Sequence, residues 1–407
     1  MKNVINMVVQ KDRCIGCSVC AGICPTDALE MKFNESGNLQ PVLVGKCLEK
    51  CDICIKNCPF NEIISTEQGL GNFVKTYEFS LKNDEKRLKS ASGGAGNYIL
   101  TEILKRKLAD KIISVRQGEK YLFEFGVFDD LKSLEMARSS AYYPVDFSKM
   151  VRYILSHDET YAITALPCLA RSLRLLQKNN FKFRKRVKFI ISLVCGGTKS
   201  ANFAQKCADI AFVRKNIELK KVNFREKISG KNALNFAFKF TSKNSETALF
   251  DRFKNIDFWN LRAFTPLACN NCNDTFATHA DITLMDAWLD KNIDDFRGTS
   301  LIILRNETLF EIFENCKENL AEISPENVLK AQLGVVKNKE LFFSKKGNFI
   351  ERKILKIKLE IQKYSAENYD CEDFIRIRLK KLNFWVKLDA KIKTAKYLIK
   401  KILGIKQ

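Results

Sequence analysis

The sequence predicts an α+β protein in three parts: a cysteine-dense head, an α/β body with a mixed sheet, and a helical basic tail. Eight of the fifteen cysteines fall before residue 60, and short apolar runs of strand length recur through the middle of the chain. At 407 residues the chain is too long for a single core, so several domains are expected. We place the parts at 1–62 for the head, 80–165 and 166–325 for the two halves of the body, and 326–407 for the tail.

The elements follow from local patterns. In the head, Leu29–Phe33 and Leu39–Val44 have strand character on either side of a turn at Asn34–Gly37. The polar run Lys82–Lys89 is typical of a solvated linker, and the residues after Tyr98 have the apolar spacing of a helix. The strands expected in the body are Ile112–Val115, Tyr121–Phe125, Thr160–Ala165 and Phe189–Val194. Their alternation with helical stretches indicates a mixed sheet covered by helices.

Composition excludes several classes of protein. The first residues lack the apolar segment of a signal peptide, and no run of eighteen residues is free of charge. Tightly spaced cysteines without a signal favour metal thiolates in a reducing compartment over disulfides, so we expect a cytoplasmic protein. His157 and His279 are the only histidines, which argues against mixed Cys/His zinc sites and histidine-centred catalysis.

Two cysteine runs in the head carry the strongest signal. They are Cys14-x2-Cys17-x2-Cys20-x3-Cys24-Pro25 and Cys47-x3-Cys51-x2-Cys54-x3-Cys58-Pro59, and their last three cysteines repeat at a separation of 34 residues. In two-cluster bacterial ferredoxins three cysteines of a run bind one 4Fe–4S cluster and the fourth binds the other. We therefore assign Cys14, Cys17, Cys20 and Cys58 to one cluster, and Cys47, Cys51, Cys54 and Cys24 to the other. Structural zinc is the alternative, but zinc knuckles do not produce this doubled pattern.

Four further cysteines lie in the body. Cys168 and Cys195 each follow an apolar run of strand length, and Cys269 and Cys272 form a CxxC pair. The ends of strands are where an α/β sheet presents its chemistry, so these four could bind a third cluster. The alternative is that Cys168 and Cys195 are small buried apolar residues, and spacing does not decide between the two. Cys207, Cys316 and Cys371 stand apart and are expected to be structural.

A glycine-rich segment, Ser92-Gly93-Gly94-Ala95-Gly96, precedes the first helix of the body. Such a segment allows the backbone to approach a phosphate at a helix N-terminus. It matches neither GxGxxG nor a P-loop, and a plain N-capping turn would also explain it.

With these residues identified, the chain resembles the coenzyme F-420 hydrogenase/dehydrogenase beta-subunit family, in the form fused to a two-cluster ferredoxin. The resemblance covers roughly residues 5 to 320. The elements that carry it, in order, are Ser90–Gly94, Ala165–Cys168, Leu193–Ser200, Phe224–Lys227, Cys269-x2-Cys272-x-Asp274, Ala280–Thr283 and Asp286–Trp288. Three positions depart from the family pattern: Leu169, Met285 and the Gly-Gly-Thr at 196–198.

The resemblance implies a third 4Fe–4S cluster and a flavin-binding body with FAD near that cluster. It places the flavin at Ser92, Gly93, Gly94 and Gly96. Lys89, Arg225 and Lys227 are candidates for contacts to flavin phosphate or substrate; solvated surface cations are the alternative. We expect electrons to pass from a donor such as ferredoxin or a reductase, through the clusters and FAD, to an organic substrate.

The resemblance also suggests a role. One interpretation is a standalone FAD- and iron–sulfur-dependent reductase acting on a sugar-linked substrate in surface-polysaccharide biosynthesis. The alternative is an electron-transfer subunit of a hydrogenase or dehydrogenase complex, with catalysis in a partner. A nucleic-acid-binding protein is a third interpretation, suggested by the net charge of +22 alone, and no recognition motif supports it.

The tail has a distinct charge pattern. Its last 34 residues hold eleven Lys and Arg against one acid, Asp389. Apolar residues recur at helical spacing (Leu388, Ile392, Ala395, Ile399 and Ile402), flanked by Lys387, Lys391, Lys396, Lys400 and Lys401. This is a basic amphipathic helix, suited to peripheral contact with the inner face of the membrane. Packing against the protein's own body or a partner is the alternative.

Overall fold

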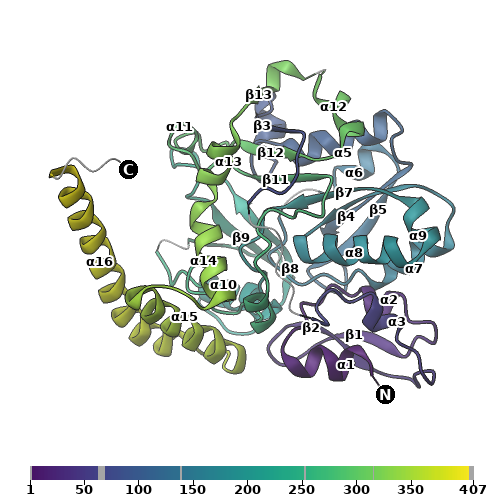
Figure 1. Ribbon diagram of the computed structural model, residues 1–407, viewed down its shortest axis with the longest axis horizontal. Helices are drawn as coiled ribbons and strands as arrows, with labels where there is room; N and C mark the ends of the chain where they lie inside the picture. Colours follow the sequence, from purple (N-terminus) through teal and green to yellow (C-terminus); the bar gives the residue numbers. More distant parts are fainter. Residues whose placement is uncertain (1, 63–68, 138–139, 252–253, 315, 403–407) are drawn as a thin grey trace.

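The computed structural model describes residues 2–62, 69–137, 140–251, 254–314 and 316–402, without the side chains of 396–402. It has the expected α+β architecture, with a small head packed beneath a large body and a long C-terminal helix that projects away from both (Figure 1). The lysines and isoleucines predicted at 396–402 belong to a described helix, but their side chains lie outside the described residues, as does part of the connection after the head.

The head is built around one β-hairpin. Strands β1 and β2 pair antiparallel, from Leu29 opposite Leu43 to Phe33 opposite Leu39. The Asn34 side chain accepts a hydrogen bond from the Asn38 amide at 2.9 Å and closes the turn. The expected hairpin is confirmed, with its second strand one residue shorter. The head's elements are α1 (Val4–Met7), η1 (Val9–Lys11), α2 (Val19–Gly22), β1 (Leu29–Phe33), β2 (Leu39–Leu43) and α3 (Ile53–Lys56).

The body contains a large mixed sheet, which confirms the predicted class. The neighbouring strands β11, β7, β6 and β4 are parallel, while the flanking pairs are antiparallel. All four strands expected from sequence are present. The spatial order is β13 (Leu320–Glu322), β3 (Lys75–Phe79), β12 (Ser300–Leu304), β11 (Ile282–Asp286), β7 (Val187–Leu193), β6 (Tyr161–Ala165), β4 (Lys111–Gln117) and β5 (Phe123–Phe128).

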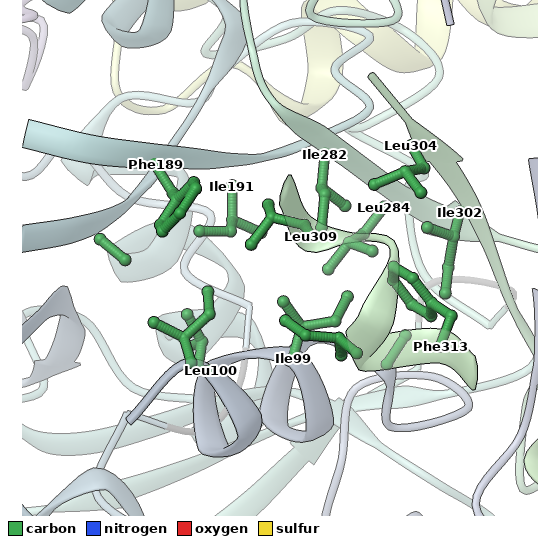
Figure 2. Close-up of a cluster of buried hydrophobic side chains, with 14 of the residues drawn as sticks. Ile99, Leu100, Phe189, Ile191, Ile282, Leu284, Ile302, Leu304, Leu309 and Phe313 are labelled. Atoms are coloured by element: carbon green, nitrogen blue, oxygen red, sulfur yellow. The ribbon is translucent and has the colours of Figure 1, made fainter. Parts of the chain in front are cut away.

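Helices cover both faces of this sheet. On one face, Ile99 and Leu100 of α5 point at the strand residues Ile191, Ile282 and Leu284 (Figure 2). Strand residues that point the opposite way contact the helices of the other face, as the period of two along a strand requires. The first face carries α5 (Ala95–Lys105), α6 (Leu131–Leu134), η3 (Glu307–Leu309) and α12 (Glu311–Glu314); the second carries α7 (Ser148–Ser156), α8 (Pro167–Asn179), α9 (Phe181–Arg186) and α13 (Pro325–Ala331).

A second, three-stranded antiparallel sheet packs an aromatic core against the C-terminal helices. Phe224 lies at its centre, within ring-contact distance of Phe238 at 5.3 Å and Phe123 at 5.9 Å between centroids. The elements around this core are β8 (Leu219–Glu226), β9 (Ala237–Ser242), β10 (Thr247–Phe250), α10 (Ala201–Phe212), α15 (Phe349–Glu367) and α16 (Glu372–Ile402). The remaining elements are α4 (Asp84–Leu88), η2 (Leu267–Asn271), α11 (Asp290–Ile293), η4 (Lys317–Asn319) and α14 (Leu333–Ser344). The helical tail expected at 326–407 is thus present in the described residues.

The polar run at Lys82–Lys89 is not the solvated linker that its composition suggested. Residues 84–88 form α4, and Arg87 is buried. Its guanidinium donates to the Gly298 carbonyl at 2.7 Å and pairs with Asp295 at 2.9 Å. The expectation was wrong because a buried arginine with internal acceptors looks, in sequence, like any other charged residue.

The head is fixed to the body by specific contacts. Helix α2 packs against α7 so closely that a Cβ at Gly22 would lie 2.6 Å from both the Ser148 carbonyl and Val151. Arg152 of α7 donates to the Ala21 carbonyl at 2.9 Å and pairs with Asp27 at 2.7 Å. The cysteine runs therefore have a fixed position relative to the large sheet.

No helix in the described ranges combines the length and apolar character needed to cross a bilayer. The three isolated cysteines, Cys207, Cys316 and Cys371, are buried in apolar cores, in agreement with the structural role expected for them.

Candidate functional site

Four thiols of the head line one cavity, which we call the inner set: Cys14, Cys17, Cys20 and Cys58. The space between them is roughly 360 Å³, counting the part that is open to solvent, and its remaining walls are mainly apolar. The chain wraps around it because Gly16 and Ser18 adopt left-handed backbone conformations, and a Cβ at Gly16 would lie only 2.5 Å from the Leu39 carbonyl oxygen. The fourth thiol comes from the second run, as the sequence assignment requires.

The electrostatics of the inner set suit a cationic occupant. Burial raises the pKa of Cys14 to about 12, and the nearby Cys17 adds to this effect. Burial likewise raises the pKa of Cys20, reinforced by the neighbouring thiols. Thiols collected in an apolar cavity ionise only if a positive charge compensates them. Iron would supply that charge, so the residues present fit a 4Fe–4S cluster, whose ligands are thiolates.

The outer set consists of Cys47, Cys51, Cys54 and, by prediction, Cys24. Burial raises the pKa of Cys54, with further contributions from Cys51 and Cys47. These cysteines keep partial solvent exposure. Cys24 and Cys54 both pack on the head's apolar core, and the Cys24 sulfur contacts the Thr26 hydroxyl at 3.8 Å. The assignment of Cys24 to this set stays a prediction.

The third set is formed where β6 and β7 end. Cys168 follows Pro167 in the first turn of α8, directly after β6, and Cys195 follows β7. Cys269 lies in η2 and Cys272 at its end. Burial raises the pKa of Cys168, and the next contributions come from Cys195 and Cys272. The four thiols are therefore neighbours, which favours the ligand interpretation over that of isolated buried apolar residues.

The inner and third sets are linked through one buried hydroxyl. The Ser172 hydroxyl of α8 lies 3.3 Å from the Cys17 sulfur and 3.0 Å from the Cys168 carbonyl oxygen, within hydrogen-bond distance of both. Cys168 also packs on the apolar core of the head. The two sets thus lie on either side of a single side chain.

Among the described residues, no three His, Cys, Asp or Glu side chains form a group that could hold a metal ion. That finding concerns single ions. A cubane of four irons and four sulfides is larger and holds its thiolates further apart.

The glycine segment lies between β3 and α5, at the edge of the sheet where β11 ends. Gly93 packs against strands, since a Cβ there would lie 2.4 Å from the Phe79 carbonyl oxygen, and its amide donates to Ser300 Oγ at 3.0 Å. Gly94 has a φ of +94° and N-caps α5. Gly96 differs from both, because a Cβ there would meet only Leu284, at an ordinary 3.4 Å.

Two predicted cations are committed to internal partners. Arg225 pairs with Asp286 at 2.7 Å and donates to the Ala91 carbonyl at 3.1 Å. Lys227 donates to the carbonyls of Arg87 and Ser92 at 2.7 and 2.9 Å, and to that of Arg297. Burial lowers the pKa of Lys227 to about 7, with Arg225 as the next cause.

These cations hold the glycine segment in place, and both also line a cavity of roughly 250 Å³ together with Ala91, Phe236 and Gly298. Lys89 does not join them: it is exposed and pairs with Glu85. Of the three predicted cations, Arg225 and Lys227 lie at the glycine segment and Lys89 does not.

Comparison with known families decides the relationship. Residues 77–152 match the N-terminal model, and residues 158–328 the C-terminal model, of the coenzyme F420 hydrogenase/dehydrogenase beta subunit. Together these matches span more than half of the chain. The chain belongs to this beta-subunit family. Residues 7–30 match a 4Fe-4S binding domain, which places an iron–sulfur module ahead of the beta-subunit body.

Individual relatives agree with this placement. The chain is 23% identical over 195 residues to one of the subunits of the F(420)H(2) dehydrogenase of Methanosarcina mazei, covering 46% of this chain and 54% of that protein. It thus spans about half the length of that relative. An uncharacterized ferredoxin of Methanocaldococcus jannaschii is 32% identical over 60 residues, which are 15% of this chain and 77% of the ferredoxin.

A solved structure shares the fold. It is a chain from the F420-reducing [NiFe] hydrogenase complex of Methanosarcina barkeri, in a xenon-derivatised form, with a TM-score of 0.51. The match has 17% sequence identity and covers 72% of this chain and 96% of that one. At this identity the likeness establishes the fold alone.

The structure explains two of the departures from the beta-subunit family pattern. Leu169 is buried against α7, α9 and the sheet, and Met285 is buried between the sheet and α13. Both are packing positions in this member of the family.

Sequence reasoning missed three buried contributors to the site. Ser172 links two thiol sets, while Arg262 and Lys339 donate hydrogen bonds to the loops of the third set. No cysteine spacing points to any of them, because each reaches the site from a different element. Asp286 was visible as part of a family element, but its pairing with Arg225 was not.

Proposed function

We propose that this chain is an electron-transfer component of a larger redox assembly, in which iron–sulfur centres carry single electrons and a partner completes the reaction. The supporting observation is the Ser172 link between the inner and third sets. The outer set adjoins the inner one in the head, where Cys24 and Cys54 pack on the same apolar core as Cys14 and Cys58. With clusters bound, electrons would pass one at a time between the centres, so the path would need an electron donor at the head and an acceptor in the partner.

The relatives favour this proposal over a standalone reductase. One is named as a dehydrogenase subunit and another is a chain of a hydrogenase complex. A sugar-linked substrate reduced by this chain alone, in surface-polysaccharide assembly, has no comparable support from those names. We therefore place the terminal organic acceptor, and the choice between F-420 and another carrier, with the partner.

Metal analysis of the anaerobically purified chain tests the proposal. We expect about twelve iron atoms per chain, four for each of three clusters, and three separately titrating centres in redox-monitored EPR. Dithionite should reduce all three, and reduced F-420 should be oxidised only after the partner is added. A count near eight would remove the third centre and break the proposed path, and F-420 turnover by the chain alone would favour the standalone reductase.

We also propose that FAD binds at the glycine segment. The α5 N-terminus and the lack of a side chain at Gly96 suit a phosphate. The fit is partial, because Arg225 and Lys227 already have internal acceptors and the adjoining cavity is small for a whole dinucleotide. When bound, a flavin would couple the one-electron centres to a two-electron carrier. Arg225 and Lys227 would hold the glycine segment in place.

Substitutions at two glycines test flavin binding. Gly96→Ala should lower the flavin content of the purified chain at least severalfold, since its Cβ would add to the backbone surface that a phosphate approaches. The melting temperature should stay nearly unchanged, because that Cβ meets only Leu284, at an ordinary 3.4 Å. Gly94→Ala is the matched contrast: its positive φ and the 2.4 Å approach to Leu81 predict lost stability. A wild-type chain that contains no flavin, and binds none when offered FAD, would refute the proposal.

The last helix is proposed to contact an anionic membrane surface. Its first half packs on α15 through Ile375 and Leu382, which fits the alternative of packing on the body. Farther along, Phe384 and Ile392 are exposed beside Lys387 and Lys391. An exposed apolar stripe flanked by lysines matches the chemistry of an acidic bilayer surface.

Charge reversal of the tail tests this contact. The double variant Lys387→Glu/Lys391→Glu should co-sediment several times less with vesicles of phosphatidylglycerol and phosphatidylcholine than the full wild-type chain. The control reverses two lysines elsewhere, Lys182 and Lys185 of α9, and should behave as wild type. Equal sedimentation of both double variants would reject a specific role for the tail.

A further inference from the structure

The helices beyond the beta-subunit body close over the third set of thiols. The C-terminal family model ends at residue 328, yet α14 and α15 contact the loops that carry three of the four cysteines. Lys339 of α14 is only 3% exposed. Its ammonium donates to the Cys195 carbonyl at 3.2 Å and to the Asp274 carbonyl. The positive charge of Lys339 is therefore held beside the loops that carry the third set.

A second buried cation lies on the same side. Arg262 is also 3% exposed, and its guanidinium donates to the Gly196 carbonyl at 3.3 Å and to the Asn270 side chain at 2.9 Å. The Phe342 ring of α14 covers it, with the ring centroid 4.1 Å from the guanidinium carbon. Packing from α14 thus keeps Arg262 over the CxxC turn.

Helix α15 fixes the backbone of that turn. Gln362 is fully buried; its amide donates to the carbonyls of Thr265 and Pro266 at 3.0 and 3.2 Å and accepts from Asn270 at 2.9 Å. The approach of the turn to the thiols therefore depends on residues almost one hundred positions farther along the chain. The two cations have little freedom to move away from the set.

The charges around the third set differ from those in the head. The groups that act on Cys195 and Cys269 include Lys339 and Arg262. Those acting on Cys14, Cys20 and Cys58 of the inner set, and on Cys54 of the outer set, are other thiols and backbone amides. A cluster gains negative charge on reduction, and a nearby positive charge in a dry interior stabilises the reduced form.

One group opposes this effect. The Asp274 carboxylate is 4% exposed, and neither of its oxygens has a hydrogen-bond partner among the described residues. Lys339, Arg305 and His279 are within electrostatic range of it. Lys339 therefore balances both the carboxylate and the thiols, and its removal would leave negative charge uncompensated.

From this arrangement we infer that Lys339 and Arg262 give the third centre the highest reduction potential of the three, so that electrons entering through the head collect there. The inference rests on the proposed third cluster. Lys339 is supplied by the C-terminal helices, and Arg262 is held in place by them. Their positive charge would favour electron flow from the head toward the third centre.

Redox-titrated EPR of the full chain tests this inference. In the wild type the third centre should be reduced first as the potential is lowered. Lys339→Met keeps the length of the side chain and removes its charge, and it should shift only the third centre to lower potential. Lys337→Met is the control, because Lys337 lies on the same helix and is exposed; all three potentials should match the wild type.

The iron count tests the third cluster, and the order of reduction tests its potential. A wild-type count near eight irons overturns both the third cluster and the inference. A count near twelve, with the third centre unshifted in Lys339→Met or not reduced first in the wild type, overturns the inference alone. If Lys339→Met fails to retain the third centre's iron, Arg262→Gln is titrated in its place, and the same downward shift is required.

Discussion

Replacing Cys58 with alanine is expected to abolish the inner centre while the outer and third centres persist. Cys58 belongs to the second run but lines the inner cavity with Cys14, Cys17 and Cys20. The variant should therefore lose about four of twelve irons and the EPR signal of one centre. Electrons supplied to the outer centre should no longer reach the third centre, because the series is broken at its middle member.

Two further variants make the result specific. Cys24→Ala should instead remove the outer centre, since the crossed assignment gives Cys24 to Cys47, Cys51 and Cys54. Cys316→Ala, at a buried cysteine outside all three sets, should keep the full iron content. If Cys58→Ala removed the outer centre and Cys24→Ala the inner one, the crossed assignment would be wrong.

The largest expected loss of stability comes from Phe224→Ala. This ring is fully buried and contacts Phe123, Tyr142, Phe203, Phe238 and Phe240. Truncating such a side chain costs about 3–5 kcal/mol, because transfer free energy is lost and a cavity is left. Urea unfolding followed by tryptophan fluorescence measures the loss, since Trp259 packs against the same core.

An exposed phenylalanine provides the matched control. Phe181 on α9 is 69% exposed, so Phe181→Ala should change the free energy of unfolding by no more than about 0.5 kcal/mol. Comparable urea midpoints for Phe224→Ala and Phe181→Ala would show that the aromatic core does not stabilise the protein as its packing indicates.

Much of the site was predictable because its signals are local. The spacing of the cysteine runs predicts crossed ligation, and the cavity that Cys58 lines together with the first run agrees with that prediction. The position of Cys168 and Cys195 after β6 and β7 follows from apolar runs that end just before them. The glycine segment likewise predicts where α5 begins.

Charged residues were the weak point of the sequence interpretation. Lys89, Arg225 and Lys227 looked equivalent, yet Lys89 is exposed while Arg225 and Lys227 bind backbone carbonyls around the glycine segment. Arg87 was assigned to a linker and is buried. Whether a cation is solvated or internal depends on acceptors brought from distant parts of the chain, and these carry no local signature.

The sequence by itself determined that this is an iron–sulfur protein of the beta-subunit family, with two cysteine runs in its head and a mixed sheet in its body. These features are encoded within short windows, where spacing and periodicity suffice. Only the tertiary structure decided that Ser172 joins the inner set to the third and that Lys339 and Gln362 reach the third set from the C-terminal helices. Such contacts join residues many positions apart, and they exist only once burial has brought their elements together.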